Sequence, residues 1–103
     1  MRVDFATLTY LCLIEAAVEG RLLVYSDLPG SRRVWGRDLH RIADYEHDHR
    51  RPPLTAIVVL KHTGRPGDGF VEAMQRVGFA KPGETVDAMW ERAVAAVFKY
   101  WRP

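Results

Sequence analysis

The sequence predicts an α+β fold, with four helices around a very small sheet, in a single domain over residues 1–103. Three observations lead to this prediction. Apolar residues recur at spacings of three and four along several stretches, which is typical of amphipathic helices. One continuous and largely β-branched run, residues 57–60, indicates a buried strand. Glycine and proline residues separate these stretches, and 48% apolar residues suffice for one ordinary core.

The first predicted helix spans residues 5–19. Asp4 is a suitable N-cap, and the apolar residues after it keep helical spacing as far as Val18. Gly20 then supplies the left-handed residue that commonly ends a helix. Residues 21–25 follow as a short β-rich segment, either a strand or a bridging turn.

A second helix is expected from Ser31, its N-cap, to about His49. Residues 26–28 begin a helical turn before it, which Pro29 and Gly30 end. The prolines at 52 and 53 prevent the second helix from continuing. Its apolar residues, on or near one face, are Val34, Trp35, Leu39, Ile42 and Tyr45.

The second half of the chain predicts a strand and two helices. Residues 54–61 are expected to form the buried strand, and residues 63–69, with three glycines and a proline, a turn. A short helix over residues 70–77 should end at Gly78. The last helix runs from Thr85 or Val86 to about residue 101, and its apolar stripe predicts core or dimer contacts.

Arginines gather at the start of the second predicted helix. Helix N-termini attract phosphate through free N–H groups and the helix dipole, and guanidinium groups add charge-assisted hydrogen bonds. A tyrosine hydroxyl a few residues earlier could bond a phosphate as well. The predicted nucleic-acid-binding residues are therefore Tyr25, Ser31, Arg32, Arg33, Arg37 and Arg41. The alternative is a solvated helix face whose arginines pair locally with Asp38 or Asp44, and a net charge of only +2 gives nucleic-acid binding little support by itself.

His40, Asp44 and His47 share one face of a helix, as the ligands of a metal site would. Two imidazoles and a carboxylate could hold zinc or manganese. The spacing forms no tight metal motif, so solvated histidines are expected, and neither a metal nor another cofactor is predicted.

No catalytic motif emerges. The glycine-rich turn at 64–69 lacks the spacing of a P-loop or a dinucleotide fingerprint. No Ser-His-Asp or Cys-His arrangement can be inferred from spacing. Cys12, in an apolar run, is expected to behave as a small buried hydrophobe. The prediction therefore leans away from an enzyme.

Cysteine content and hydropathy suggest a compartment. A single cysteine cannot form an intrachain disulfide, which favours a reducing environment. The first apolar segment has no basic run before it and is interrupted by polar residues, so it does not predict a signal peptide. No apolar run approaches the length of a membrane span. We expect a cytoplasmic protein without membrane contact.

Two segments resemble a known family. Gly20-Arg-Leu-Leu-Val-Tyr25-Ser-Asp-Leu28 and Arg33-Val-Trp-Gly-Arg-Asp-Leu39 are similar to the winged-helix half of DNA alkylguanine alkyltransferases and alkyltransferase-like proteins. That family has a glycine, a Thr-Tyr-Gly turn and an Arg-Ala-Val-Gly element that opens its recognition helix. Gly69-Phe70 is similar to its later Gly-Tyr or Gly-Phe, so the resemblance covers about residues 20–70.

The resemblance implies a winged-helix-like frame and roles for two residues. Arg33 would match the finger that fills the space left by a flipped nucleotide, and Tyr25 the tyrosine near the rotated phosphate. The family's Pro-Cys-His-Arg, or its version with tryptophan, should fall near residues 55–60, where this chain has Thr-Ala-Ile-Val-Val-Leu. Without an acceptor for the alkyl group, alkyl transfer is excluded.

The sequence thus leads to one function and one alternative. The first is a non-catalytic nucleic-acid-binding domain of winged-helix type that uses a basic helix, with DNA and RNA both left open. The alternative is a small protein-interaction module, such as an inhibitor, adaptor or immunity factor, that binds a partner protein or a second copy of itself. The alternative follows from the nearly neutral charge and from the aromatic residues of the last helix, Trp90, Phe98, Tyr100 and Trp101.

Overall fold

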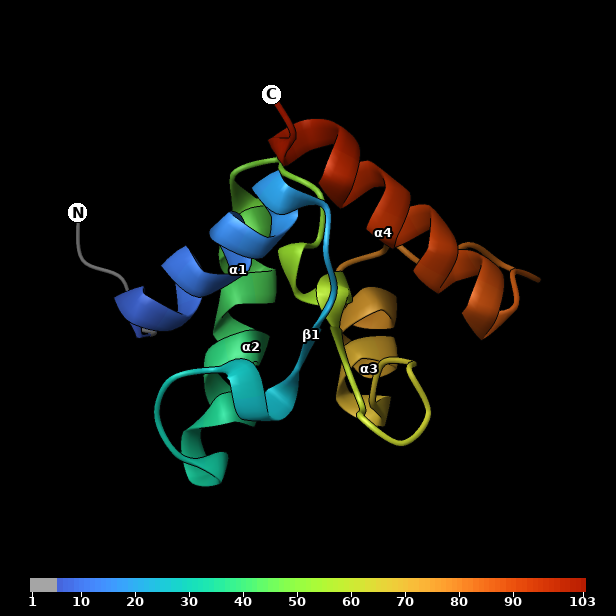
Figure 1. Ribbon diagram of the computed structural model, residues 1–103. Coiled ribbons are helices and arrows are strands. Elements are labelled where there is room, and N and C mark those ends of the chain that lie inside the picture. Colours follow the sequence, from blue (N-terminus) through green and yellow to red (C-terminus); the bar gives the residue numbers. More distant parts are fainter. Residues whose placement is uncertain (1–5) are drawn as a thin grey trace.

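A computed structural model describes residues 6–103, in which four α-helices surround a two-stranded parallel sheet (Figure 1). This arrangement confirms the α+β prediction. The elements, in chain order, are α1 (Thr7–Glu19), β1 (Leu23–Val24), the 3₁₀ turn η1 (Tyr25–Asp27), α2 (Arg32–Asp48), the 3₁₀ turn η2 (Leu54–Ile57), β2 (Val58–Val59), α3 (Asp68–Arg76) and α4 (Val86–Trp101).

Two helix ends carry clear terminal residues. Gly20 ends α1 in the left-handed conformation, with φ of 71°. Thr85 caps α4, because its Oγ1 accepts a 3.1 Å hydrogen bond from the backbone N–H of Ala88. Ser31 is the N-cap residue of α2, but its side chain makes no capping hydrogen bond. The predicted cap of the first helix, Asp4, lies outside the described residues.

The predicted strand over residues 54–61 is only partly correct. Leu54–Ile57 forms the turn η2, and the strand is reduced to Val58–Val59. Residues 54–59 are all buried, so their apolar character reflects burial on every side and does not distinguish a strand from another buried conformation. The short helix α3 begins at Asp68, two residues before the predicted residue 70.

The two strands run parallel, with Leu23 opposite Val58 and Val24 opposite Val59. Parallel strands need a crossover connection, and α2 lies within it. The start of α2 follows η1, the turn that carries Tyr25, after only four residues.

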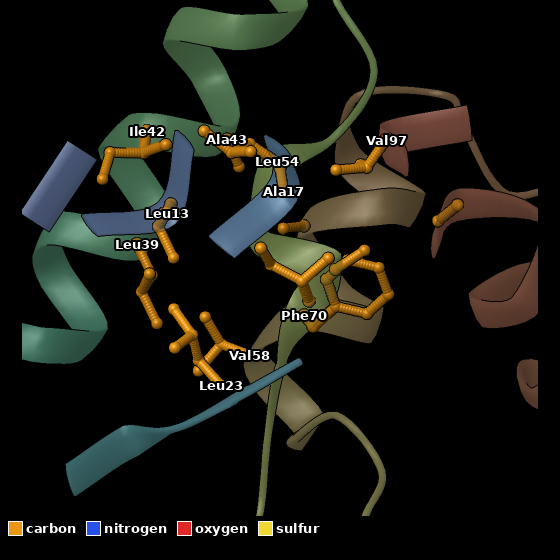
Figure 2. Close-up of a cluster of buried hydrophobic side chains, with 14 of the residues drawn as sticks. Leu13, Ala17, Leu23, Leu39, Ile42, Ala43, Leu54, Val58, Phe70 and Val97 are labelled. Atoms are coloured by element: carbon orange, nitrogen blue, oxygen red, sulfur yellow. The ribbon is translucent and has the colours of Figure 1, made fainter. Parts of the chain in front are cut away.

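The core is built around η2, which contacts α1, α2 and α4. Figure 2 shows side chains from these helices converging on one apolar cluster. Burying each large aliphatic side chain contributes about 1.5–3 kcal/mol. Fully buried members include Leu13, Ile42, Leu54, Ile57, Met74 and Val97. Because α2 turns Leu39, Ile42 and Ala43 inward, its first-turn arginines are left on the surface.

None of the helices within residues 6–103 combines the length and the hydropathy that crossing a bilayer requires.

Candidate nucleic-acid interface

The N-terminal turn of α2 carries two unpaired cations. Arg32 and Arg33 are exposed, and neither has an ion pair or a side-chain hydrogen bond with any residue of 6–103. The hydroxyl of Ser31 is exposed and makes no capping bond. The first N–H groups of an α-helix have no partner inside the helix. This end of α2 therefore offers positive charge and hydrogen-bond donors to an anion.

Arg37 and Arg41, one and two turns further, are less free. Arg37 is exposed over 57% of its side chain, and its Nε lies 3.9 Å from Oδ1 of the buried Asp38. That distance is beyond a hydrogen bond, so the ion pair is loose. Arg41 is partly buried and is engaged in an interaction of its own. The predicted pairing of these arginines with Asp38 or Asp44 is therefore found only as the loose contact of Arg37. Arg32 and Arg33 do not take part in it.

Tyr25 lies between the start of α2 and the turn that precedes α3. Its ring centroid is 6.3 Å from that of Trp35, and its hydroxyl lies beside Gly67, at 3.4 Å from the position a Cβ would take there. Burial raises the pKa of Tyr25, which keeps the hydroxyl protonated and able to donate to a phosphate. Trp35 Nε1 donates a 3.2 Å hydrogen bond to the carbonyl oxygen of Pro29, which ties the preceding loop to α2.

Two hollows meet at Tyr25 and Gly36, and both residues line each of them. The first hollow is completed by Arg32, Trp35 and Leu60. The second lies between α2 and α3 and has Thr55 and Phe70 in its lining. A Cβ added to Gly36 would meet no atom within 4 Å, so the backbone of α2 is open to a ligand at this point.

The three residues weighed as a metal site do not form one. Asp44 Oδ1 accepts a 2.7 Å hydrogen bond from Arg76 of α3, and its Oδ2 is 3.7 Å from His40 Nε2. Arg76 also lies 3.3 Å from His40 Nδ1, which must act as the acceptor because a guanidinium only donates. His47 lines a different cavity, with Arg51 and Phe79. Within the described part of the chain, no three histidine, cysteine or acidic residues could hold a metal ion.

Sequence reasoning overlooked a buried polar cluster at the other end of α2. Glu46 is fully buried, and its Oε1 accepts hydrogen bonds from the Tyr10 hydroxyl at 2.6 Å and from Arg51 Nε at 3.0 Å. Burial, and then the hydrogen bond to this carboxylate, raises the pKa of Tyr10. Glu46 continues the inward-facing series Leu39, Ile42, Ala43 at helical spacing, which was the signal available in the sequence.

The aromatic residues of α4 lie mostly inside the protein. Trp90 Nε1 donates a 2.8 Å hydrogen bond to the carbonyl oxygen of Ala56. Phe98 and Trp101 are partly buried and pack against the core, whereas Tyr100 is 53% exposed. The sequence-based argument for a protein partner at this helix therefore rests on Tyr100.

Cys12 is partly buried and packs against the core cluster, as a small hydrophobe would. Its Sγ lies 3.9 Å from the carbonyl oxygen of Asp27, and burial raises the pKa of its thiol. A raised pKa disfavours the thiolate, the form that a nucleophilic cysteine needs.

Comparisons of the chain with protein-family models, curated proteins and solved structures found no match. The fold and the site define a small α+β domain with a basic helix start beside two hollows.

Proposed function

We propose that this domain binds nucleic acid through the N-terminal end of α2 and catalyses no reaction on it. The observation that carries the proposal is the exposure of Arg32 and Arg33, unpaired within the described residues, at the first turn of a 17-residue helix. Had both guanidinium groups been locked to neighbouring carboxylates, little charge would remain for a polyanion.

The chemistry of this surface suits phosphate. Arg32 and Arg33 can each meet a phosphate oxygen, while the free N–H groups of the helix start and the Ser31 hydroxyl add donors. Arg37 extends the cationic surface by one turn. Its Nε is 3.9 Å from Asp38, too far for a hydrogen bond, so its charge is available to a ligand. Each neutralised phosphate releases counterions, so the affinity should fall with salt concentration.

The frame proposed for this binding is a winged helix, in keeping with the resemblance to alkyltransferase-like proteins. In that frame α2 is the recognition helix, and the turn between β2 and α3 takes the place of a wing. Two backbone hydrogen bonds shape this turn, from Leu60 N to Arg65 O and from Gly64 N to Leu60 O, both 2.8 Å. Lys61 and Arg65 are exposed on it.

Tyr25 and Arg33 have the roles that the resemblance implies. Tyr25 supports the backbone of the bound strand with its protonated hydroxyl, and Arg33 reaches into the space left by a displaced nucleotide. Base extrusion costs a few kcal/mol of unstacking, which the phosphate contacts must offset. The hollows around Tyr25 and Gly36 leave the surface of α2 open for such an approach.

Fluorescence anisotropy with labelled duplex DNA, single-stranded DNA and RNA, at about 50 and 200 mM salt, tests the proposal. The Arg32→Ala/Arg33→Ala variant should bind less tightly, with the slope of log K against log salt reduced by roughly 1.8 for duplex DNA. The control is Arg21→Ala/Arg102→Ala, which removes the same charge from two exposed arginines outside both the start of α2 and the turn between β2 and α3.

Two results would reject the proposal. One is the absence of binding to all three nucleic acids at micromolar protein and low salt. The other is an equal loss of affinity in the two double variants, because net charge and not the start of α2 would then explain the binding.

A protein-interaction module remains the second candidate function, and one observation favours it. Helix α1 exposes Leu8 over 70% and Leu11 over 52% of their surface, and the two lie about one turn apart, whereas the exposed Val86 and Tyr100 lie near opposite ends of α4. Exposed apolar residues that adjoin one another are typical of interaction sites.

A further inference from the structure

Helix α1 has a mainly apolar stripe, interrupted by one glutamate, on its outer face in addition to its buried face. Its inner face is formed by Leu13, Ala16 and Ala17, all 0% exposed. The outer stripe follows the spacing three, four, three, which places side chains on one side of a helix. Its members are Leu8, Leu11, Glu15 and Val18, and the side chain of Glu15 is 72% exposed.

The part of the stripe from Leu8 to Glu15 forms one wall of an open groove. The opposite wall is the turn that follows η1, which in Figure 1 extends beside α1 on the side away from α4. An apolar helix face facing an apolar turn can bury anchor residues of a ligand on two sides. The groove is lined by Leu8, Leu11 and Cys12 on α1 and by Leu28 and Pro29 on the turn, with Glu15 and Asp27 as its acidic members.

The groove and its edge carry net negative charge. Glu15, Glu19 and Asp27 are acidic, and Arg21 contacts the first two of them. Arg21 Nε bonds Glu19 at 2.9 Å, whereas its Nη2 is 3.7 Å from Glu15. Among the described residues that line the groove, Glu15 and Asp27 are acidic and none is basic. This surface therefore repels nucleic acid and favours a basic ligand.

A second copy of the chain fits this charge pattern poorly. In a symmetric pair of α1 helices the same stripe is used by both copies. Glu15 of each copy would then enter the shared apolar seam, and the stripe itself has no basic residue to meet it. Burying two carboxylates without partners costs more free energy than the apolar contacts of a short stripe contribute.

We propose that this groove binds an amphipathic helix of another protein, with apolar residues at the same three-and-four spacing and a lysine or arginine aligned with Glu15. The apolar anchors take the places beside Leu8 and Leu11 in the groove, and a further apolar residue can cover Val18 beyond its end. The basic residue forms a close ion pair with Glu15. Arg21 does not form one, because its Nε is bonded to Glu19 and its Nη2 stays 3.7 Å from Glu15. This surface is separate from the start of α2, so its test is independent of the nucleic-acid proposal.

Two synthetic amphipathic peptides with leucines at this spacing provide the probe, one with lysine and one with glutamate at the position aligned with Glu15. The lysine peptide should bind roughly tenfold more tightly than the glutamate peptide. Glu15→Lys should reverse that order. Leu11→Ser should weaken the lysine peptide by about tenfold, whereas Val86→Ser, which alters a 50% exposed valine of α4, should leave its binding unchanged.

Cys12 offers a second readout, because it is the only cysteine and lies in the wall of the groove. The bound lysine peptide should slow alkylation of its thiol. Circular dichroism of each variant verifies that the fold is retained, which the exposure of the substituted residues favours.

Three results would overturn the proposal. They are equal binding of both peptides, no binding of either at millimolar concentration, and a dimer in sedimentation that Leu11→Ser dissociates. The last result would identify a second copy of the chain as the occupant of the groove.

Discussion

The Tyr10 hydroxyl donates a 2.6 Å hydrogen bond to the fully buried carboxylate of Glu46, which joins α1 to the C-terminal half of α2. Arg51 completes the cluster, with its Nη2 also 3.0 Å from Glu46 Oε1. Such a cluster is sensitive to the loss of one member, because a charge left alone in the interior is poorly solvated.

Replacing Arg51 with methionine should therefore destabilise the protein by about 3–5 kcal/mol. The variant keeps most of the side-chain volume and leaves Glu46 buried without its cation. Urea unfolding measures the effect. The control Arg50→Met changes the neighbouring exposed arginine and should stay within about 0.5 kcal/mol of the parent protein. A loss below about 1 kcal/mol for Arg51→Met would contradict this view of the cluster.

Glu84 should make the stability depend on pH in the acidic range. Hydrogen bonds from Arg92 lower the pKa of Glu84 from 4.5 to about 2. Because its pKa in the folded state lies below the unfolded value, the stabilisation is present above pH 4.5 and is lost as the pH falls towards about 2. Urea midpoints measured across this range should fall, and Glu84→Gln should flatten part of the decline. Glu91→Gln, at an exposed position of α4, should leave the profile unchanged.

The two N-cap residues should respond differently to alanine. Thr85→Ala removes a hydrogen bond to the N–H of Ala88 and should cost about 1 kcal/mol. Ser31→Ala removes a side chain that makes no capping bond, so its effect on stability should be much smaller. Thermal or urea unfolding compares the two variants, and equal losses would show that Ser31 does cap α2 in solution.

Gly36→Ala should separate stability from binding. Gly36 lies inside α2, and an added Cβ meets no atom within 4 Å, so alanine should stabilise the protein by about 0.5–1 kcal/mol. The same methyl group enters the hollows shared with Tyr25, so it should weaken nucleic-acid binding in the anisotropy assay. Higher stability with unchanged affinity would place the nucleic acid elsewhere on the protein.

The sequence predicted those elements whose ends carry local signals. The last helix was predicted correctly because its apolar residues keep helical spacing from Val86 to Trp101. The strand over residues 54–61 was overextended because complete burial removes the alternation that distinguishes strand from turn. The start of α3 at Asp68 was predicted two residues too late, because Gly67 and Gly69 favour a turn that continues to residue 69.

The candidate site was predictable only where it depends on one helix. The exposure of Arg32 and Arg33 follows from the inward face of α2, which the apolar spacing defines. The partner of Asp44 does not follow from spacing, because Arg76 reaches it from α3, across 32 positions of the chain. The groove beside α1 likewise depends on how the turn at residues 27–29 packs, which is a tertiary property.

The parallel pairing of Leu23 with Val58 has a consequence for how the chain is made. During synthesis on the ribosome, β1 emerges long before its partner and cannot form a hairpin with the residues next to it. The strand β1 stays unpaired until Val59 has left the exit tunnel, and the apolar face of α1, which packs against η2 and α4, is covered completely only later. A nascent chain stalled before that point should be a substrate for chaperones, whereas one released just beyond it can close the sheet.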